Sequence, residues 1–253
     1  MELYLKAGLF GEVYLMKVDN LSHGFSRDVA RRTKRARRAY VMCSAKNGHV
    51  EIRLESRLEQ SVAQVMELDP RVRAYRAQPF TLEFSSNELL PHKHAVKPQD
   101  ASYYTPDFSV QLEDLQIVLE VKPRAFLVEH SELLGKVRTA LLRKGIRFVV
   151  LCEDHFRGHY LRNIQVLLPY LTQVAHALPL WAAPLQNLKP SELLGPVRDV
   201  LITGTPANYQ LAAGLLLGIV RFDLEAHLFE RMDFEIAPAF GSLGAFEVIR
   251  YES

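Results

Sequence analysis

The feature that most constrains the fold is a pair of short apolar segments that flank a polar turn and carry an acidic residue at each outer end. Asp107 precedes the first segment, and Glu120 closes the second. Two β-rich segments around a short polar turn, here Glu113-Asp114, usually pair as a hairpin. Because side chains alternate faces along a strand, Glu120 and Lys122 should point the same way. We therefore predict that Asp107, Glu120 and Lys122 converge on one small volume.

Two carboxylates and one ammonium group in a small volume suit phosphodiester chemistry. Mg²⁺ prefers oxygen ligands and usually takes one or two carboxylates together with water and substrate phosphate. Such an ion polarises the phosphoryl oxygen and lowers the pKa of an attacking water. Lys122 would orient that water or neutralise charge on the phosphate. The pattern indicates a nuclease, whereas the alternative is an exposed hairpin with an ordinary turn and a solvated Glu/Lys pair.

A third acidic residue precedes this hairpin in the sequence. Leu58, Val62, Val65 and Met66 recur at helical spacing and predict an amphipathic helix. Glu59 lies at the border of its apolar stripe, where a carboxylate can face a cleft. Glu55 lies one turn earlier and is also near the stripe, so the periodicity leaves both residues open, and both could be ordinary solvated helix residues.

The order of these parts resembles the TnsA family, the endonuclease subunits of heteromeric cut-and-paste transposases. The resemblance runs from about Arg31 to about Leu171. Its specific points are Ser-Arg-Leu-Glu at 56–59, Asp-Phe at 107–108 and Glu-Val-Lys-Pro at 120–123. It implies a restriction-endonuclease-like catalytic domain of the PD-(D/E)xK type.

Position by position, the resemblance implies a complete catalytic set. The catalytic residues would be Glu59, Asp107, Glu120 and Lys122, and the first three would bind the metal, Mg²⁺, for which Mn²⁺ can substitute. At least one family member has an amide at the position of Glu120, so a carboxylate here strengthens the metal site. The resemblance also selects Glu59 over Glu55.

The fold expected for residues 1–171 is α/β, with a mixed sheet flanked by helices. Gly145 is a helix-ending signal, and the continuous apolar run after it suits a buried strand. A pair of histidines, His92 and His94, falls in an expected loop and is more typical of solvent exposure than of metal binding. The expected elements are strands at 49–54, 72–84 and 146–152, a loop at 85–103, and helices at 129–144 and 155–171.

Residues 172–253 are expected to form a smaller, mostly helical domain. Five prolines from Pro179 to Pro206 separate short helices, and Tyr209–Ile219 is predicted to be another helix. Asp223–Arg231 is expected to form a strand or short helix. Phe234–Ile236 and Phe246–Ile249 are predicted to be strands of a terminal hairpin. Helices followed by a hairpin are typical of a winged-helix-like module, which the resemblance also implies.

Charge is distributed unevenly between these two regions. Residues 1–171 hold 26 Lys/Arg and 20 Asp/Glu, whereas residues 172–253 hold 5 and 9. A dense basic run can attract DNA phosphate, although it could equally be a solvated or disordered arm. We expect DNA contacts from this run: Arg31, Arg32, Lys34, Arg35, Arg37 and Arg38. The acidic C-terminal region suits protein docking better than DNA, and the resemblance implies a TnsC-type ATPase regulator as its partner.

The composition agrees with a globular bacterial cytoplasmic protein. The chain has 253 residues, of which 48% are hydrophobic and 24% charged. We find no apolar stretch of about 18 residues that would span a membrane and no secretion signal at the N-terminus. Cys43 and Cys152 are far apart without metal-type spacing, which favours free thiols in a reducing compartment.

The sequence therefore predicts a metal-dependent DNA endonuclease that acts as one subunit of a transposase. By resemblance it would hydrolyse double-stranded DNA at the 5′ ends of the transposon, while a TnsB-type subunit cuts and joins the 3′ ends. Two alternatives remain. One is a stand-alone restriction or repair endonuclease of the same fold, and the other is a non-catalytic DNA-binding scaffold.

Overall fold

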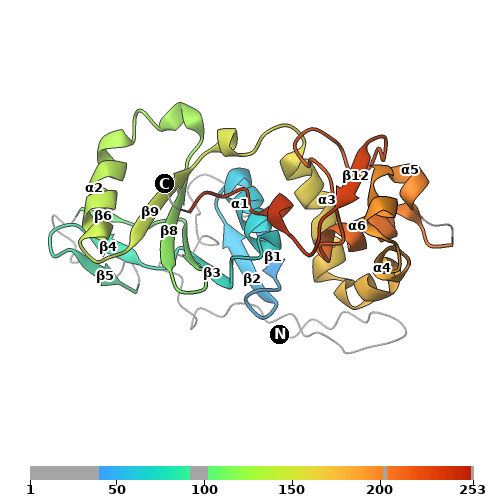
Figure 1. Cartoon of the computed structure of the whole chain (residues 1–253). Coiled ribbons are helices and arrows are strands. Elements are labelled where there is room, and N and C mark those ends of the chain that lie inside the picture. Colours follow the sequence, from blue (N-terminus) through green and yellow to red (C-terminus); the bar gives the residue numbers. More distant parts are fainter. Residues whose placement is uncertain (1–39, 92–101, 202–203, 252–253) are drawn as a thin grey trace.

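A four-stranded mixed sheet organises the chain, whose computed structural model describes residues 40–91, 102–201 and 204–251 (Figure 1). In spatial order its strands are β3 (Ala74–Ala77), β7 (Phe108–Gln111), β8 (Gln116–Val121) and β9 (Arg147–Leu151). β3, β7 and β8 pair antiparallel, and β9 runs parallel to β8. The predicted hairpin is confirmed, because β7 and β8 are adjacent and joined by a turn at residues 112–115.

The helix α2 (Ser131–Leu142) covers one face of this sheet. It follows the short 3-10 helix η4 (Arg124–Phe126) and connects β8 to β9, as a parallel pair requires. Its Val137 and Leu141 pack with Val118 and Phe148 of the sheet. Gly145, with φ of 71°, follows the helix, so the predicted helix, its stop signal and the buried strand after it are all confirmed.

The helix α1 (Arg57–Leu68) covers the opposite face. Alternate residues of β8 separate the two faces, since Ile117 and Leu119 pack in the cluster that contains α1, whereas Val118 packs with α2. α1 also packs on α3 (Tyr160–Thr172), which follows η5 (Glu153–His155). The hairpin β1 (Tyr40–Ser44) and β2 (Val50–Leu54) lies beside α1. This mixed α/β arrangement is consistent with a TnsA-like nuclease fold.

Two expected elements near β3 differ from the structure. The single strand expected at 72–84 is broken into β3 and β4 (Thr81–Glu83), because Gln78 adopts a left-handed φ of 41° and Pro79 cannot donate to a ladder. The expected loop at 85–103 contains β5 (Glu88–Leu90) and the start of β6 (Tyr103–Tyr104). These pair with β4 as a second sheet of order β5-β4-β6. Residues 92–101, with His92 and His94, lie outside the described residues.

The C-terminal region combines short helices with a small sheet. Strand β12 pairs antiparallel with β10 on one side and β11 on the other. The predicted helix at 209–219 is confirmed in α6, and the strand predicted at 234–236 is found in β12. The elements are η6 (Ala175–Ala177), α4 (Leu178–Gln186), η7 (Pro190–Leu193), β10 (Gly195–Pro196), α5 (Val197–Val200), α6 (Ala207–Leu216), β11 (Val220–Arg221), β12 (Glu235–Pro238) and η8 (Gly244–Phe246).

Two predictions for this region are wrong. Asp223–Arg231 forms turns, because the Asp223 carboxylate accepts hydrogen bonds from the backbone of Glu225 and Ala226 at 2.8 and 3.0 Å. Phe246–Ile249 is not a strand. Phe246 is the last residue of η8, and the Phe246 and Ile249 side chains are buried without strand pairing of their backbone. The predicted terminal hairpin is therefore absent from the described residues, and a winged-helix arrangement is not confirmed.

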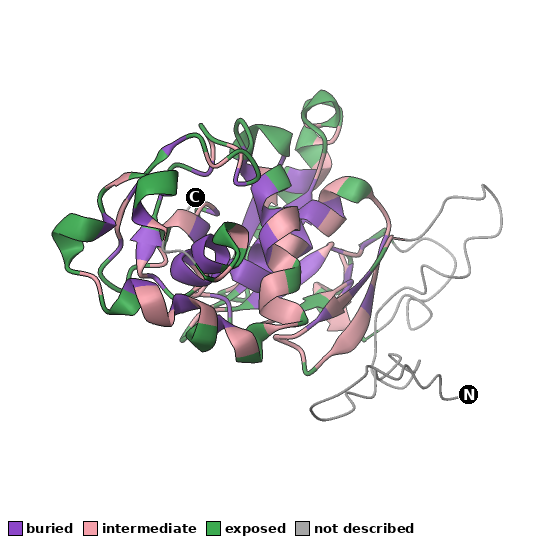
Figure 2. Cartoon of the chain, turned by 90° about the vertical axis from the view of Figure 1, so that its right-hand side faces the viewer, coloured by how far each residue is buried: buried purple, intermediate pink, exposed green. Residues whose placement is uncertain are grey.

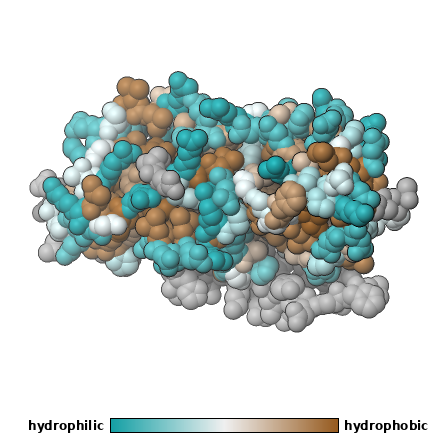
Figure 3. All heavy atoms as spheres, viewed as in Figure 1, coloured by the Kyte–Doolittle hydropathy of each residue, from teal (hydrophilic) through white to brown (hydrophobic). Residues whose placement is uncertain are grey.

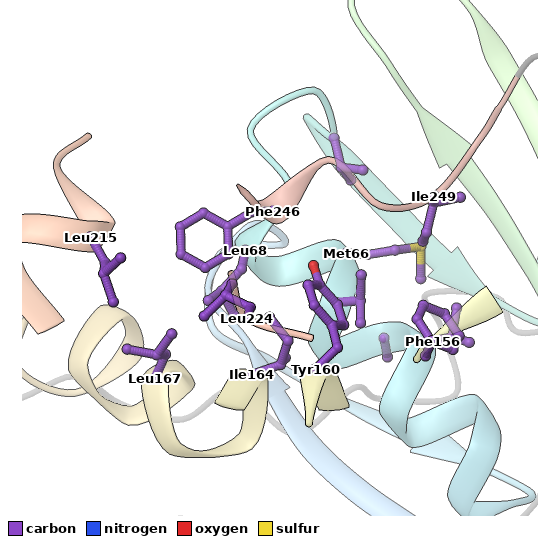
Figure 4. Close-up of a cluster of buried hydrophobic side chains, with 14 of the residues drawn as sticks. Met66, Leu68, Phe156, Tyr160, Ile164, Leu167, Leu215, Leu224, Phe246 and Ile249 are labelled. Atoms are coloured by element: carbon purple, nitrogen blue, oxygen red, sulfur yellow. The ribbon is translucent and has the colours of Figure 1, made fainter. Parts of the chain in front are cut away.

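One hydrophobic cluster extends from α1 through α3 into the C-terminal region. Figure 4 shows Phe246 and Ile249 close to α1 and α3, and both are 1% exposed. Polar contacts fix the same segment: Arg71 donates to the Ile249 carbonyl at 2.9 Å, and the Tyr251 hydroxyl donates to Asp69 at 3.2 Å. In Figure 2 the buried residues lie in the middle of the molecule, under exposed turns and helix surfaces. The end of the chain thus packs against the helix that carries Glu59.

The surface mixes polar and apolar groups. On the face in Figure 3, hydrophobic side chains appear over both halves of the molecule among more numerous hydrophilic ones. Across residues 40–91, 102–201 and 204–251, no single helix is long and apolar enough to cross a membrane. Only Tyr160–Thr172 and Ala175–Gln186 together, as a pair bent by 82°, reach that length and composition.

Candidate active site

The hairpin β7–β8 places Asp107 beside Glu120. Phe108 lies opposite Leu119, so the next pair along the ladder is Asp107 and Glu120. The Val121 backbone N–H donates to Asp107 Oδ2 at 2.7 Å, which fixes the carboxylate against the end of β8. Asp107 is half-buried and Glu120 is 1% exposed. The sequence prediction that these two side chains meet agrees with this geometry.

Lys122 lies at the same place, one residue beyond β8. Its backbone N–H donates to the Leu151 carbonyl at 2.9 Å and so extends the pairing with β9. Its Nζ lies 2.8 Å from Glu120 Oε1. Burial lowers the pKa of Lys122, but the negative charges of Glu120, Asp107 and Glu59 outweigh burial and raise that pKa above its ordinary value. Lys122 is therefore charged at neutral pH.

Glu59 enters the site from the first turn of α1. Ser56 caps the helix by accepting from the Glu59 backbone N–H at 3.1 Å, and its hydroxyl donates to Glu59 Oε1 at 2.8 Å. Glu59 Oε2 accepts from the Glu55 backbone N–H at 2.8 Å. These bonds resemble a capping box, except that the Glu59 carboxylate accepts from the residue before the N-cap, and they fix the start of the helix. Glu59 is 5% exposed, whereas Glu55 is less buried.

The three carboxylates influence one another electrostatically. Burial, followed by repulsion from Glu120 and Glu59, raises the pKa of Asp107 well above its ordinary value, against the smaller opposing effects of the Val121 N–H and Lys122. Burial also raises the pKa of Glu59, with further increases from the charges of Glu55 and Glu120. These mutual effects mean that the hairpin and α1 bring Glu59, Asp107 and Glu120 into one acidic region.

The carboxylates of this site are suitable ligands for a hard divalent cation, but their arrangement matches a metal site only in part. Carboxylate oxygens are the ligands that Mg²⁺ prefers, and Glu120 Oε2 is buried without a hydrogen-bond partner in the described part of the chain. An orphaned acceptor of this kind is costly unless a ligand satisfies it. However, the described part of the chain contains no group of three or more His, Cys, Asp or Glu poised to hold a metal ion. Glu59 bonds to its own helix start, and Asp107 accepts from the Val121 N–H.

Other expected site residues cannot be placed. The basic run, Arg31, Arg32, Lys34, Arg35, Arg37 and Arg38, lies outside the described residues. Sequence reasoning missed the part that Ser56 plays, although Ser-x-x-Glu before an apolar run is a recognisable capping signal. It also missed the Val121 N–H as the donor to Asp107, which no residue pattern could reveal.

A family model described as TnsA-like endonuclease N terminal matches residues 69–153. The match spans about a third of the chain and contains Asp107, Glu120 and Lys122, whereas Glu59 precedes it. No curated protein matches the chain.

Proposed function

We propose that this protein is a metal-dependent DNA endonuclease subunit of a heteromeric transposase, because residues 69–153 match the TnsA-like endonuclease N-terminal family model. The observation that carries the proposal is the pairing of Asp107 with Glu120 at the start of the hairpin, with Lys122 beside them. Its substrate would be double-stranded DNA at the 5′ ends of the transposon. A TnsB-type subunit would process the 3′ ends.

Each residue of the site has a distinct part in hydrolysis. Asp107 and Glu120 would hold Mg²⁺ or Mn²⁺, with Glu59 as a further ligand once it leaves its bonds at the helix start. The ion, when bound, supplies Lewis-acid polarisation of the phosphate and a more acidic water. Lys122 would place its ammonium beside the reacting phosphate and stabilise the negative charge that builds there. The packed β7–β8 hairpin keeps these groups in place between α1 and α2.

The contacts with partners follow from charge. The basic run at 31–38 would bind DNA backbone with strong salt dependence, because each neutralised phosphate releases counterions. Residues 172–253, with 5 Lys/Arg against 9 Asp/Glu, would dock on a protein, for which a TnsC-type ATPase is the candidate. The expected boundary between a nuclease domain at 1–171 and a docking domain at 172–253 belongs to this proposal.

A second candidate function is a non-catalytic DNA-binding scaffold. The observation that favours it is that all three carboxylates have structural partners: Glu59 with Ser56, Asp107 with Val121, and Glu120 with Lys122. In a scaffold these carboxylates would only stabilise the fold through these contacts. The orphaned Glu120 Oε2 favours the nuclease instead, because a purely structural carboxylate gains nothing from an unsatisfied buried oxygen.

Cleavage of end-labelled DNA by paired variants tests the proposal. Glu120→Gln and Lys122→Ala should each reduce the cutting rate in Mg²⁺ by at least about 100-fold, because Glu120 would hold the metal and Lys122 would stabilise charge on the reacting phosphate. The matched controls are Glu132→Gln and Lys136→Ala, since this Glu/Lys pair is equally close, at 2.7 Å, but exposed on α2. The reaction should contain the protein partners whose genes neighbour this one. Unchanged 5′-strand cutting by both site variants would favour the scaffold.

A further inference from the structure

The row of residues that contains Asp107 and Glu120 continues onto β3 and ends at Gln78. Ala77 lies opposite Phe108, so the next pair along this ladder is Gln78 and Asp107. The Gln78 backbone N–H donates to the Asp107 carbonyl at 2.8 Å, which confirms that the pairing extends to this position. Gln78, Asp107 and Glu120 thus occupy neighbouring positions across three adjacent strands.

The Gln78 side chain has an unused hydrogen-bond donor. It is 3% exposed, and its Nε2 is buried with no hydrogen-bond partner among the residues that the structure describes. Buried amide donors are almost always paired, because an unpaired donor loses its water without compensation. A donor left unpaired at the edge of an acidic site is explained if a ligand that is absent from the free protein accepts its hydrogen bond.

The backbone at Gln78 is also unusual. Its φ of 41° lies in the left-handed region, which glutamine rarely adopts, and the Pro79 that follows favours an extended conformation instead. Strained residues of this kind concentrate at functional sites, where the surrounding structure holds them. The strain separates β3 from β4 and fixes the amide at the end of the row. It is independent of the unpaired donor and points to the same residue.

The chemistry of the surroundings selects the ligand. Asp107 and Glu120 offer only acceptors, and the Lys122 ammonium directs one of its three donors to Glu120 at 2.8 Å. A phosphodiester has acceptors alone, so it needs donors where it meets these carboxylates. Gln78 also lines a cavity of about 120 Å³ beside β2, whose wall includes Arg76 and an Arg53 that is paired with Glu51 at 2.8 Å. A phosphate oxygen therefore matches the spare amide donor.

We propose that Gln78 donates a hydrogen bond from Nε2 to a non-bridging oxygen of the DNA phosphate bound beside Asp107 and Glu120. Gln78 is then a substrate-binding residue of the nuclease site. This inference rests on the proposed nuclease function and adds a residue to it. It also predicts that removal of the Gln78 amide weakens DNA binding without lowering the stability of the fold.

The decisive variant is Gln78→Met in the full-length protein, because methionine keeps the volume and removes the donor. The melting temperature should stay within about 2 °C of wild type or rise, since no bond of Nε2 is lost in the free protein. Binding of a fluorescein-labelled DNA duplex in Ca²⁺, or cutting in Mg²⁺ at subsaturating DNA, should weaken about tenfold, as expected for a hydrogen bond to a charged group. Gln116→Met, exposed at the far end of the hairpin, should match wild type in every measurement.

A second variant guards against misfolding. Gln78→Asn should fold, because asparagine tolerates the left-handed conformation better than most residues, and it draws the amide back by one methylene. It should weaken cutting as well. Stable variants that bind and cut like wild type would overturn the inference, and so would a large fall in melting temperature for both, which would make Gln78 structural. If wild type itself neither binds nor cuts DNA, the proposed function fails, and the inference fails with it.

Discussion

At the level of single residues, Glu59 shows how one carboxylate can belong to a helix cap and to an acidic site. The sequence left Glu59 and Glu55 open, and only the family resemblance selected Glu59. In the structure Glu59 is the more buried, and its charge contributes to the raised pKa of Asp107. The catalytic role of Glu59 remains a prediction. Residue spacing could place Glu120 and Lys122 on one face, because strand alternation is regular, but it could not reveal the backbone bonds that hold Glu59.

Substitutions at Glu59 separate its role in the helix cap from its expected role in metal binding. Glu59→Gln keeps an acceptor for the helix start and removes the charge, so its free energy of unfolding should stay within about 1 kcal/mol of wild type. Its DNA cutting should nevertheless be lost if Glu59 binds the metal. Glu59→Ala should lose cutting and also about 1 kcal/mol of stability from the broken cap. Urea unfolding and strand cleavage measure the two effects.

Glu55→Gln is the matched control. It removes a neighbouring carboxylate but keeps the residue 55 backbone N–H, which donates to the Glu59 side chain. It should leave cutting unchanged. Normal cutting by Glu59→Gln together with loss in Glu55→Gln would show that the wrong carboxylate was chosen.

At the level of elements, the parts predicted best are those with local signals. The hairpin β7–β8, the helix α2 and the strand β9 each have clear periodicity and a turn or stop residue, and all three are confirmed. The strand expected at 72–84 was wrong at Gln78 and Pro79, because glutamine rarely adopts a left-handed backbone and Pro79 cannot donate to a ladder. The predicted strand at 246–249 was wrong for another reason: its apolar residues are buried by distant helices, which period-two patterning cannot distinguish from a sheet.

Two glycines near α2 give an element-level prediction. Gly145→Ala should lower the free energy of unfolding by about 1 kcal/mol, because φ of 71° is strained for any residue with a Cβ, although no atom lies within 4 Å of that Cβ. Gly135 lies in the middle of α2, exposed and equally free of clashes, so Gly135→Ala should raise the free energy of unfolding by up to about 1 kcal/mol. Chemical denaturation of both variants tests this, and equal effects at the two positions would contradict it.

At the level of the whole molecule, residues 246–251 join the C-terminal region to the four-stranded sheet. Arg147 donates to the Tyr251 carbonyl at 2.9 Å, and Arg71 lies 5.0 Å from the centre of the Tyr251 ring. These contacts span more than 100 residues of sequence, so no local pattern could predict them. Because the tail also packs near α1, which carries Glu59, the two halves of the described chain should unfold together.

Two phenylalanines of the C-terminal region test this coupling. Phe246→Ala should cost about 3 to 5 kcal/mol, since the ring is 1% exposed in the cluster with α1 and α3. Phe240→Ala, at a ring 78% exposed, should cost less than about 0.5 kcal/mol. Trp181 fluorescence, which reports the C-terminal helices, and far-ultraviolet circular dichroism should follow one coincident transition in wild type. Two separated transitions would contradict a shared core.

The central claim is that Asp107 and Glu120 form a divalent-metal site, and the free energy of unfolding of the complete chain at neutral pH tests it most directly. The raised pKa of Asp107 means that the folded state holds its proton more tightly than the unfolded chain does. Ionisation of Asp107 therefore destabilises the fold, and stability falls as pH rises from about 4 through the raised pKa. Asp107→Asn removes this effect and keeps an acceptor for the Val121 N–H.

Measured by urea unfolding with and without Mg²⁺, wild type should gain about 2 to 3 kcal/mol at a magnesium concentration roughly 100 times the dissociation constant. Asp107→Asn should be more stable than wild type without the metal and should gain little from it. Wild type that is indifferent to Mg²⁺, or an Asp107→Asn variant stabilised by Mg²⁺ as much as wild type, would contradict the claim.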